Sequence, residues 1–496
     1  MRIVATLLLA LLLLTMAADL RPPEYDEAYS IFLTAGDPRP AWPQGVFHPA
    51  DVRSFYQGTP SPAKIAHDLR TGDVHPPLYF WALEYWRRLT GPSWFAARML
   101  SVLFSVAALT ALAWLATLAE IPAATTILIA TLSYGFAYTG IVARGFALAQ
   151  LLNILGMALT LKASKTNTPT YAFTAGLAFG AAGFSNDLSI FIGASTLFWL
   201  GLQSHPLSLR AKQGNPSLTF TALGLAVFLP PIADFFIAQH NARIGQFTPF
   251  SPAHAFLLLA KDSGAALLGG LPLYAGRAGD LVTAALFTLV AICVAFTIKN
   301  WQSKLAPFAI ATAATPAGLL ALGLIFNNTP IEIRYLAFSL PFLALLLAQT
   351  LPRRLLYLLL TCEACAIAGL IFAAATQQPQ AIAARQGGKF TTPAPLILLP
   401  FGNDGVGIPG PFIASAPPNA RLELIKPGGL PNLAAEQHVI LVTIAIDAAS
   451  KQATANALRR LQENPCWIKT SSTDLLKLYT QNCRVSLNPT LKHSQK

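Results

Sequence analysis

Charged residues are scarce in this chain. Asp, Glu, Lys and Arg make up 11% of its 496 residues, whereas hydrophobic residues make up 54% and the mean hydropathy is +0.51. Soluble domains carry about 25% charged residues. A chain of this length with so few charges is not expected to be soluble, and most of its apolar surface is expected to face lipid.

The chain also lacks a basic patch, although its formal net charge is +12. Its Lys and Arg residues are scattered at the ends of apolar runs, which argues against nucleic acid as a partner. Basic residues at run ends are what the positive-inside rule predicts. The sequence contains no internal repeat, no low-complexity tract and no glycine-rich phosphate loop.

Cysteine is rare as well, with five in the chain. Cys293, Cys362 and Cys365 lie inside apolar runs. The spacing Cys362-Glu-Ala-Cys365 is that of zinc and redox motifs, but no second pair of ligands lies nearby. We therefore interpret these residues as small packing residues.

Long apolar runs dominate the chain. A run of about 18 residues is a candidate transmembrane helix, and on this basis the sequence predicts about eleven. They lie at 3–19, 95–118, 123–142, 147–161, 171–185, 188–202, 218–238, 281–298, 305–326, 336–350 and 355–375. Segment 253–272 is apolar but interrupted by Lys261 and Asp262, and we expect an interfacial or re-entrant piece there.

The distribution of basic residues predicts the orientation. With a cytoplasmic N-terminus, the inside connections carry Lys162, Lys165, Arg210, Lys212, Lys299, Lys304, Arg353 and Arg354. The same parity places 20–94, 239–280, 327–335 and the tail from 376 on the periplasmic side of a bacterial inner membrane.

The first apolar run has a second interpretation. Arg2, a Leu-rich centre and the small residues Ala17 and Ala18 also fit a cleaved signal peptide. We favour a retained span, because the acidic pair that follows makes sense only if it is held at the membrane surface.

The tail has the pattern of a small α/β domain. Strands are predicted at 395–400, 439–444 and 475–479, and a helix at 448–464. The predicted fold class is thus a polytopic α-helical membrane protein with a small C-terminal α/β domain. Its domains are a membrane domain at 1–375, which contains the outer loop 20–94, and a periplasmic domain at 376–496.

Two cysteines of the tail are predicted to form a disulfide. Cys466 and Cys483 lie outside the predicted spans, on the side where bridges persist. The segments 466–469 and 475–479 flank a Ser/Thr-rich turn and suggest a hairpin that brings the two cysteines together. Two free thiols are the alternative, because the register of the hairpin is not known from the sequence.

Candidate catalytic residues cluster in the loop 20–94. Asp26 and Glu27 follow the first span, and a carboxylate there is suited to accept a proton or hold a metal. In His75-Pro-Pro-Leu-Tyr79, the two prolines enforce an extended approach to an aromatic segment. A His at that rim can bind phosphate or take a proton.

Two arginines lie at the outer ends of apolar runs. They are Arg144, in Val142-Ala-Arg144-Gly-Phe146, and Arg334, in Glu332-Ile-Arg334-Tyr335. An ionisable group at membrane depth is a functional candidate by default. A guanidinium suits a phosphate, because its donors match the oxygens in pairs. Snorkelling to the headgroups is the alternative.

These motifs together resemble a known family. Asp26-Glu27, His75-Pro-Pro-Leu-Tyr79 and Gly91-Pro-Ser-Trp-Phe-Ala-Ala-Arg98 are similar to elements of the GT-C class of membrane glycosyltransferases. Within it the chain looks like glycosyltransferase family 39, the protein mannosyltransferase-like group, which includes relatives of the lipid A aminoarabinose transferase. Arg144-Gly-Phe-Ala-Leu148 and Arg334-Tyr335 resemble its Arg-x-Tyr-x-Leu and late Arg-Tyr elements. The resemblance extends over residues 1–375.

The resemblance implies a GT-C-like fold and a function. The family moves a sugar from an undecaprenyl- or dolichyl-phosphate donor to an acceptor hydroxyl at an outward-facing site, with inversion at the anomeric carbon. By position it implies Asp26 as catalytic base with its neighbour Glu27, His75 as the His of the second motif, and Arg144, Arg334 and Tyr335 around the donor phosphate.

The chain departs from the family pattern at two places. Phe146 stands where Tyr is commoner, which puts a hydroxyl contact there in doubt. Asn186-Asp187 stands where relatives often show His or Thr, so the acceptor side is expected to differ.

The implied partners are the bilayer, a lipid-linked sugar donor, and a glycan, lipid or protein acceptor. The sequence leaves open the sugar, the acceptor and the need for a divalent metal. A transporter or lipid-linked-glycan flippase is the second hypothesis, although such proteins place their charges near the midplane of the membrane. A non-catalytic anchor for the tail is the third.

Overall fold

A computed structural model describes residues 1–204, 216–239, 247–298, 303–373, 378–390, 394–402 and 405–483. The basic residues Arg210, Lys212 and Lys299 of the predicted cytoplasmic loops lie outside this range. The chain forms two compact units. Unit 1 comprises Met1–Arg21 and Thr59–Ala374, and unit 2 comprises Pro22–Gly58 and Ala375–Lys496.

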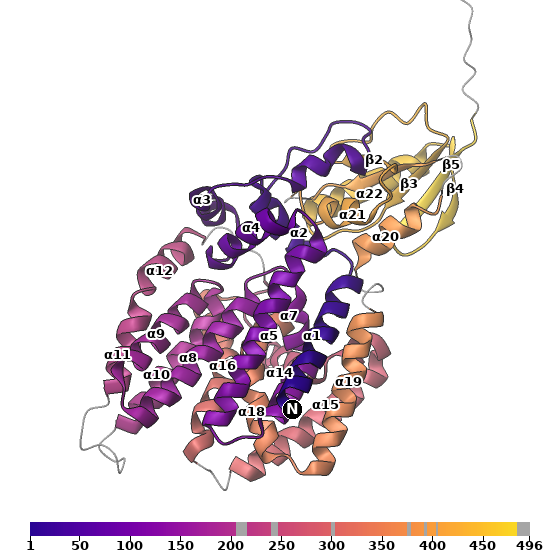
Figure 1. The fold of residues 1–496 in the computed structure, drawn as a ribbon. Coiled ribbons are helices and arrows are strands. Elements are labelled where there is room, and N and C mark those ends of the chain that lie inside the picture. The colour runs from indigo at the N-terminus through magenta and orange to yellow at the C-terminus, as the bar shows by residue number, and fades with distance from the viewer. Residues whose placement is uncertain are drawn as a thin grey trace, which may run out of the picture. The chain divides into compact units, whose positions relative to one another are not determined.

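Unit 1 is built of helices. In chain order they are α1 (Arg2–Leu20), α3 (Pro62–Gly72), α4 (Leu78–Thr90), α5 (Trp94–Leu118), α6 (Ala123–Leu132), α7 (Tyr134–Ile141), α8 (Phe146–Thr166), α9 (Pro169–Gly183), α10 (Ile190–Ser204), α11 (Pro216–Ala226), α12 (Leu229–Ala238), α14 (Pro252–Leu268), α15 (Gly270–Ile298), α16 (Ala306–Phe326), α17 (Ile333–Leu336), α18 (Leu340–Thr350) and α19 (Arg353–Phe372). Figure 1 shows α8, α9, α10 and α11 side by side in this bundle.

Membrane-length helices are confirmed, but the predicted number of eleven spans is not. Among the described residues, six helices are long and apolar enough to cross a membrane, and up to eight spans result if each bent pair counts as one. The bent pairs are α6 with α7, at 71°, and α11 with α12, at 44°. The first pair falls inside the run 123–142 and the second overlaps the run 218–238, each of which the sequence predicts as a single span.

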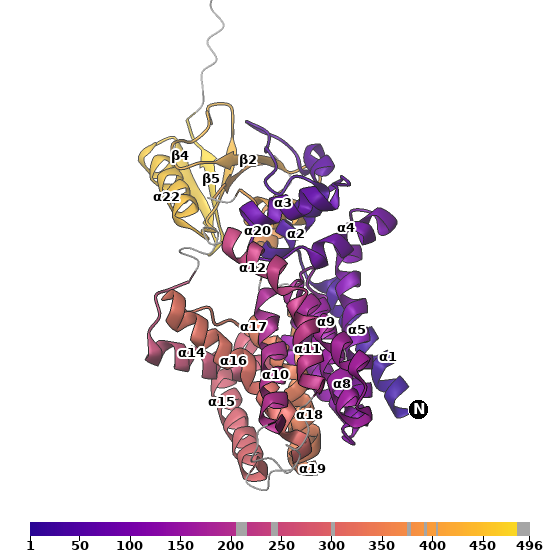
Figure 2. The same cartoon turned by 90° about the vertical axis from the view of Figure 1, so that its left-hand side faces the viewer.

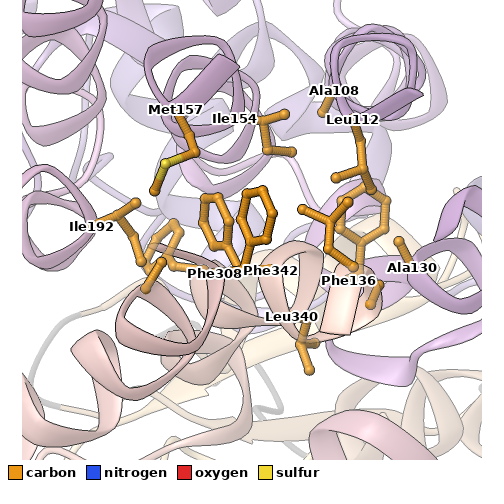
Figure 3. Close-up of a cluster of buried hydrophobic side chains, with 14 of the residues drawn as sticks. Ala108, Leu112, Ala130, Phe136, Ile154, Met157, Ile192, Phe308, Leu340 and Phe342 are labelled. Atoms are coloured by element: carbon orange, nitrogen blue, oxygen red, sulfur yellow. The ribbon is translucent and has the colours of Figure 1, made fainter. Parts of the chain in front are cut away.

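Leu, Ile, Ala and Phe side chains form most of the core of unit 1. Figure 3 shows Phe308 and Phe342 between Met157, Ile154 and the neighbouring helices, and all of these side chains are buried. Helices α9 and α11 pack backbone to backbone. A Cβ added at Gly176 would lie 2.1 Å from the carbonyl oxygen of Thr221, so only glycine fits at this crossing.

Unit 2 contains a five-stranded sheet. Its strands are β1 (Leu396–Pro400), β2 (Arg421–Ile425), β3 (His438–Val442), β4 (Trp467–Ser472) and β5 (Leu476–Gln481), in the order β2-β1-β3-β5-β4. Strand β1 is parallel to β2 and β3, and β5 is antiparallel to β3 and β4. Helix α22 (Ala448–Glu463) lies against the sheet (Figure 2). Alternate side chains of β1 and β3 pack on its apolar face.

A disulfide closes the open end of the β4–β5 hairpin. The sulfur atoms of Cys466 and Cys483 are 2.09 Å apart, and the Cα atoms are separated by 4.9 Å. This is the pair expected from the sequence. Strand β4 ends at Ser472 and therefore extends beyond the predicted segment 466–469.

The N-terminal loop contributes to unit 2. Its elements are α2 (Tyr25–Ala35) and the 3-10 helix η1 (Pro49–Tyr56), which join α20 (Pro379–Gly387) and α21 (Pro409–Ser415) of the tail. A Cβ added at Gly407 would lie 1.9 Å from the ring of Tyr25, and one at Gly410 would lie 2.8 Å from the methyl group of Ala28. These two glycines let α2 approach the tail closely. The structure thus groups 22–58 with the tail, whereas the sequence assigns this segment to the membrane domain.

Candidate functional site

Arg144 occupies a break between two helices of unit 1. Helix α7 ends at Ile141, the backbone at Val142 is extended, and α8 begins at Phe146. The Arg144 side chain is 5% exposed, and its Nη1 atom lies 3.2 Å from Oδ2 of Asp73. The guanidinium carbon also lies 5.7 Å from the centre of the Phe80 ring. The broken helix therefore presents a buried guanidinium with a carboxylate partner.

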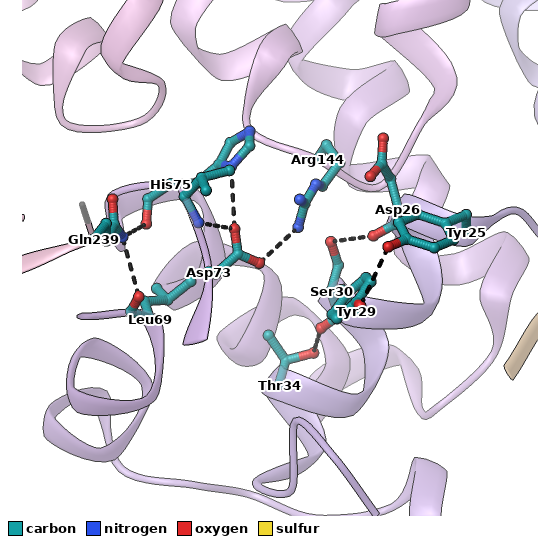
Figure 4. A network of polar contacts seen from close by, with 11 residues as sticks. Tyr25, Asp26, Tyr29, Ser30, Thr34, Leu69, Asp73, His75, Arg144 and Gln239 are labelled. Atoms are coloured by element: carbon teal, nitrogen blue, oxygen red, sulfur yellow. Dashed lines mark hydrogen bonds and ion pairs between the residues drawn. The ribbon is translucent and has the colours of Figure 1, made fainter. Parts of the chain in front are cut away.

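Asp73 is the centre of this network (Figure 4). Its Oδ1 atom accepts a hydrogen bond from the backbone N–H of Val74 at 2.6 Å and lies 3.2 Å from Nδ1 of His75. Burial by itself would raise the pKa of Asp73. The charge of Arg144 and the hydrogen bond with His75 outweigh burial and hold this pKa well below its usual range. Asp73 is therefore ionised and charge-paired with Arg144.

The loop that carries Asp73 and His75 is fixed at several points. The side-chain amide of Gln239, just after α12, donates to the carbonyl oxygens of Leu69 and His75 at 3.1 and 3.0 Å. The two prolines after His75 lead into α4, whose first residue, Leu78, donates its N–H to the carbonyl oxygen of Phe184 at 3.3 Å. His75 is buried, and Pro77, directly before α4, has helical backbone angles, so the extended approach predicted for the two prolines is not found at Pro77.

Arg334 and Tyr335 lie in the short helix α17. The Nε atom of Arg334 is paired with the carboxylate of Glu332, and its guanidinium carbon lies 5.1 Å from the centre of the Tyr335 ring. Both Arg334 and Arg144 lie close enough to the Tyr335 hydroxyl to interact with it electrostatically. The structure thus brings the two predicted phosphate-binding arginines to one tyrosine.

A row of aromatic rings connects the two arginine environments. The centroid of the His75 ring lies 6.3 Å from that of Phe146, which lies 6.4 Å from that of Tyr335. Phe146, where the family pattern favours Tyr, is therefore a buried packing residue between two predicted site residues. Its position supplies no hydroxyl, while Tyr335 next to it does.

The acidic pair Asp26-Glu27 lies in unit 2, in the first turn of α2. Glu27 is completely buried, and Asp26 is half-buried. The backbone carbonyl of Asp26 accepts a hydrogen bond from the Ser30 hydroxyl at 3.3 Å (Figure 4). Carboxylates in the first turn are stabilised by the helix dipole, which explains why an acidic pair begins this helix.

Sequence reasoning missed the carboxylates that pair with the arginines. Asp73 stands two positions before His75, and Glu332 stands two before Arg334. The available signal was physical, because a buried guanidinium requires a counterion. Asn186 and Asp187, which the sequence leaves without a role, form the start of a short 3-10 helix before α10, where the Asn186 side chain caps the N–H of Leu188.

A pocket opens beside Arg334. It has a volume of about 370 Å³ and is lined by Tyr138, Asp262, Glu332, Ile333 and Arg334. In the part of the chain that the structure describes, no group of three or more His, Cys, Asp or Glu residues could hold a metal ion.

Comparison with known proteins yields structural similarity alone. No family model and no curated protein matches the chain. Similar solved structures include ArnT from Cupriavidus metallidurans bound to undecaprenyl phosphate, with 12% identity, 96% of this chain and 97% of that chain covered, and a TM-score of 0.49. The archaeal oligosaccharyltransferase AglB from Archaeoglobus fulgidus, in complex with an inhibitory peptide and a dolichol-phosphate, is 12% identical over 98% of this chain and 75% of that one, with a TM-score of 0.38. Both are GT-C-fold enzymes.

Proposed function

We propose that the protein is a membrane glycosyltransferase that moves a sugar from a polyprenyl-phosphate donor to an acceptor hydroxyl. The observation that carries this proposal is that Arg334 lies against the Tyr335 ring and that the charges of both Arg334 and Arg144 act on the Tyr335 hydroxyl, in a unit built of membrane-length helices. Guanidinium groups bind phosphate oxygens in pairs, and a lipid phosphate enters at the headgroup level. Paired cations at helix ends suit such a ligand.

The proposed reaction is a displacement at the anomeric carbon. The acceptor oxygen forms a bond to that carbon, the bond to the phosphate oxygen breaks, and the phosphate leaves with the electron pair. Arg144 and Arg334 stabilise the charge that develops on the phosphate. Asp26 accepts the proton of the acceptor hydroxyl, and Glu27 supports it as its acidic neighbour.

His75 acts in this proposal through Asp73. Its Nδ1 atom faces the Asp73 carboxylate, and the same carboxylate holds Arg144. His75 is therefore a positioning residue that keeps Asp73, and with it the guanidinium, in place. The Asp73 charge also limits the net positive charge of the site, so that a phosphate product can leave.

Binding of the carrier tests the role of the arginines. Undecaprenyl phosphate is titrated against the full-length protein in lipid nanodiscs, and the thermal unfolding midpoint is measured. The lipid should stabilise the wild type and should stabilise Arg144→Ala and Arg334→Ala much less. Arg70→Ala is the matched control, because Arg70 forms an ion pair whose two side chains are 46% and 49% exposed. Equal stabilisation of all variants would refute the donor site.

Transfer activity tests the base. Asp26→Asn should abolish sugar transfer and retain binding of undecaprenyl phosphate. Asp37→Asn, at an exposed Asp just after the same helix, should leave transfer unchanged. Full turnover by Asp26→Asn with a lipid-linked sugar that the wild type uses would end the assignment of Asp26.

We also propose that the N-terminus is cytoplasmic and that the tail lies in the periplasm of a bacterial inner membrane. The alternation of basic connections supports this orientation. A reporter that is active only in the periplasm, fused after residue 376, should be active. Robust activity of a cytoplasmic reporter at that junction would reverse the orientation.

One observation favours the second candidate, a transporter or flippase. Glu363 lies within the membrane-length helix α19, is completely buried, and has no hydrogen-bond partner for either carboxylate oxygen among the described residues. An intramembrane carboxyl is typical of transport pathways. Movement of a fluorescent lipid-linked glycan in proteoliposomes that is lost in Glu363→Gln would support that reading over the transferase.

A further inference from the structure

The pocket beside Arg334 contains a carboxylate that the proposed phosphate site does not use. Asp262, in α14, lines the pocket and is 9% exposed. Its carboxylate makes no hydrogen bond or ion pair with any other side chain among the described residues. Burial raises its pKa to about 6, although the neighbouring charge of Lys261 opposes this shift. A carboxyl group buried in this way requires a hydrogen-bond donor from a ligand or water.

A second carboxylate and a phenol share the pocket with Asp262. Glu332 lies close enough for the Asp262 charge to act on it, and burial together with this like charge raises its pKa. Glu332 also forms an ion pair with Arg334. The ring of Tyr138 is held by stacking on Tyr134, at 5.9 Å between centroids, and by the guanidinium of Arg21 at 4.7 Å.

The chemistry of this lining selects the ligand. In their ionised forms the two carboxylates offer only acceptors, so they repel an anion and match a ligand rich in hydroxyl donors. Arg334 at the same wall belongs to the proposed phosphate site. The volume of about 370 Å³ lies within the usual range of small-molecule pockets. A phosphate bound to the arginines thus has an adjoining compartment suited to hydroxyl groups.

We propose that this pocket holds the sugar of the lipid-linked donor, with Asp262 and Glu332 accepting hydrogen bonds from its hydroxyl groups. The inference rests on the proposed function and adds a substrate class to it, namely sugars that carry no acidic group. A uronic acid would place its carboxylate against two others and is excluded.

Binding measurements separate the sugar from the carrier. Undecaprenyl phosphate, a panel of undecaprenyl-phosphate-linked neutral hexoses and pentoses, and the glucuronic acid counterpart are titrated against the full-length protein in nanodiscs. At least one neutral sugar should bind the wild type more tightly than the bare carrier. Asp262→Asn should reduce that affinity about tenfold or more, because it removes a charged acceptor, and should leave affinity for the bare carrier unchanged.

Two further variants sharpen the result. Glu332→Gln should lose the additional affinity that the sugar gives. It should bind the bare carrier at least as tightly as the wild type does, because Arg334 loses the carboxylate that competes with the phosphate. Asp280→Asn, at an exposed Asp of α15 in the same unit, is the control and should behave as the wild type. The opposite responses of Glu332→Gln to carrier and sugar distinguish a binding role from general unfolding.

Each negative outcome has its own meaning. If the wild type does not bind undecaprenyl phosphate, the proposed function fails and the sugar pocket fails with it. If the carrier binds but no neutral sugar adds affinity, or Asp262→Asn loses none, only the sugar pocket is wrong. Tight binding of the glucuronic acid donor refutes the substrate class. Stabilisation by Mn²⁺ or Zn²⁺ alone that Asp262→Asn abolishes shows a cation site and overturns the inference.

Discussion

Asp73→Asn removes the charge that balances the buried Arg144 and leaves the shape of the side chain unchanged. The two side chains are 10% and 5% exposed, so little water is available to replace the carboxylate. Breaking a buried ion pair by removing one partner costs about 3–5 kcal/mol. The Asn amide retains an oxygen that can accept a hydrogen bond. We therefore expect a loss at the lower end of this range, so that the free energy of unfolding falls by about 3 kcal/mol.

An exposed ion pair of the same unit provides the control. Asp234, in α12, forms an ion pair with Arg70, and the two side chains are 49% and 46% exposed. Surface pairs of this kind contribute about 1 kcal/mol or less. Asp234→Asn should therefore be nearly neutral in the same assay, which isolates the effect of burial from that of losing an Asp.

Reversible unfolding in mixed detergent micelles measures both variants. The double variant Asp73→Asn/Arg144→Met adds a thermodynamic cycle. Because removing both partners leaves no uncompensated charge, its cost should be smaller than the sum of the single costs by about 1–3 kcal/mol. Strict additivity, or an Asp73→Asn cost no larger than that of Asp234→Asn, would refute the pairing of Asp73 with Arg144 as the structural basis of the site.

Three further outcomes are expected. Cys483→Ser should destabilise unit 2 by about 3 kcal/mol, because the bridge to Cys466 closes a loop of 17 positions; full alkylation of both thiols in native membranes would show that the bridge is absent. Gly176→Val should lower the free energy of unfolding by about 1–3 kcal/mol or more, because its Cβ would meet a carbonyl oxygen of α11. Gly201→Val, with open space around the glycine, should not lower it. Similar losses of stability in the two variants, measured by thermal unfolding, would refute the close crossing. Because the pKa of Asp73 is lowered, its ion pair contributes fully to the stability of the fold above about pH 4, and this contribution is lost only as the pH falls through the folded pKa. The activity of the wild type and that of Asp73→Asn should therefore change with pH in parallel between about pH 7 and 5. Divergence of the two pH profiles in that window would contradict the lowered pKa.

The sequence predicts the elements whose apolar pattern is long or periodic. The run 95–118 is found as α5, and the predicted tail helix 448–464 is found as α22. Strands β1, β3 and β5 lie where the sequence predicts strands, in short apolar runs bounded by turn residues. These successes share one cause, because burial imposes a local pattern on each element.

Features set by distant partners are not readable in the same way. The break between α6 and α7 falls at Ser133, two positions before Gly135, within a run that the sequence predicts as a single span. Strand β2 was missed, because Arg421 and Glu423 interrupt its short apolar pattern. The pairing of Arg144 with Asp73 joins positions 71 apart. Tertiary packing decides these features, and the residue pattern of a single segment does not predict such packing.

The packing of α2 on Gly407 and Gly410 has a consequence for synthesis. The ribosome makes Asp26 before the whole of 59–374, but the tail that completes its unit follows only after that segment. A nascent chain that has inserted every long helix still has no finished surroundings for its acidic pair. A polypeptide released before its C-terminal portion is therefore expected to be inert. Under the proposed function, such a product of premature termination is expected to insert into the bilayer without transferring sugar.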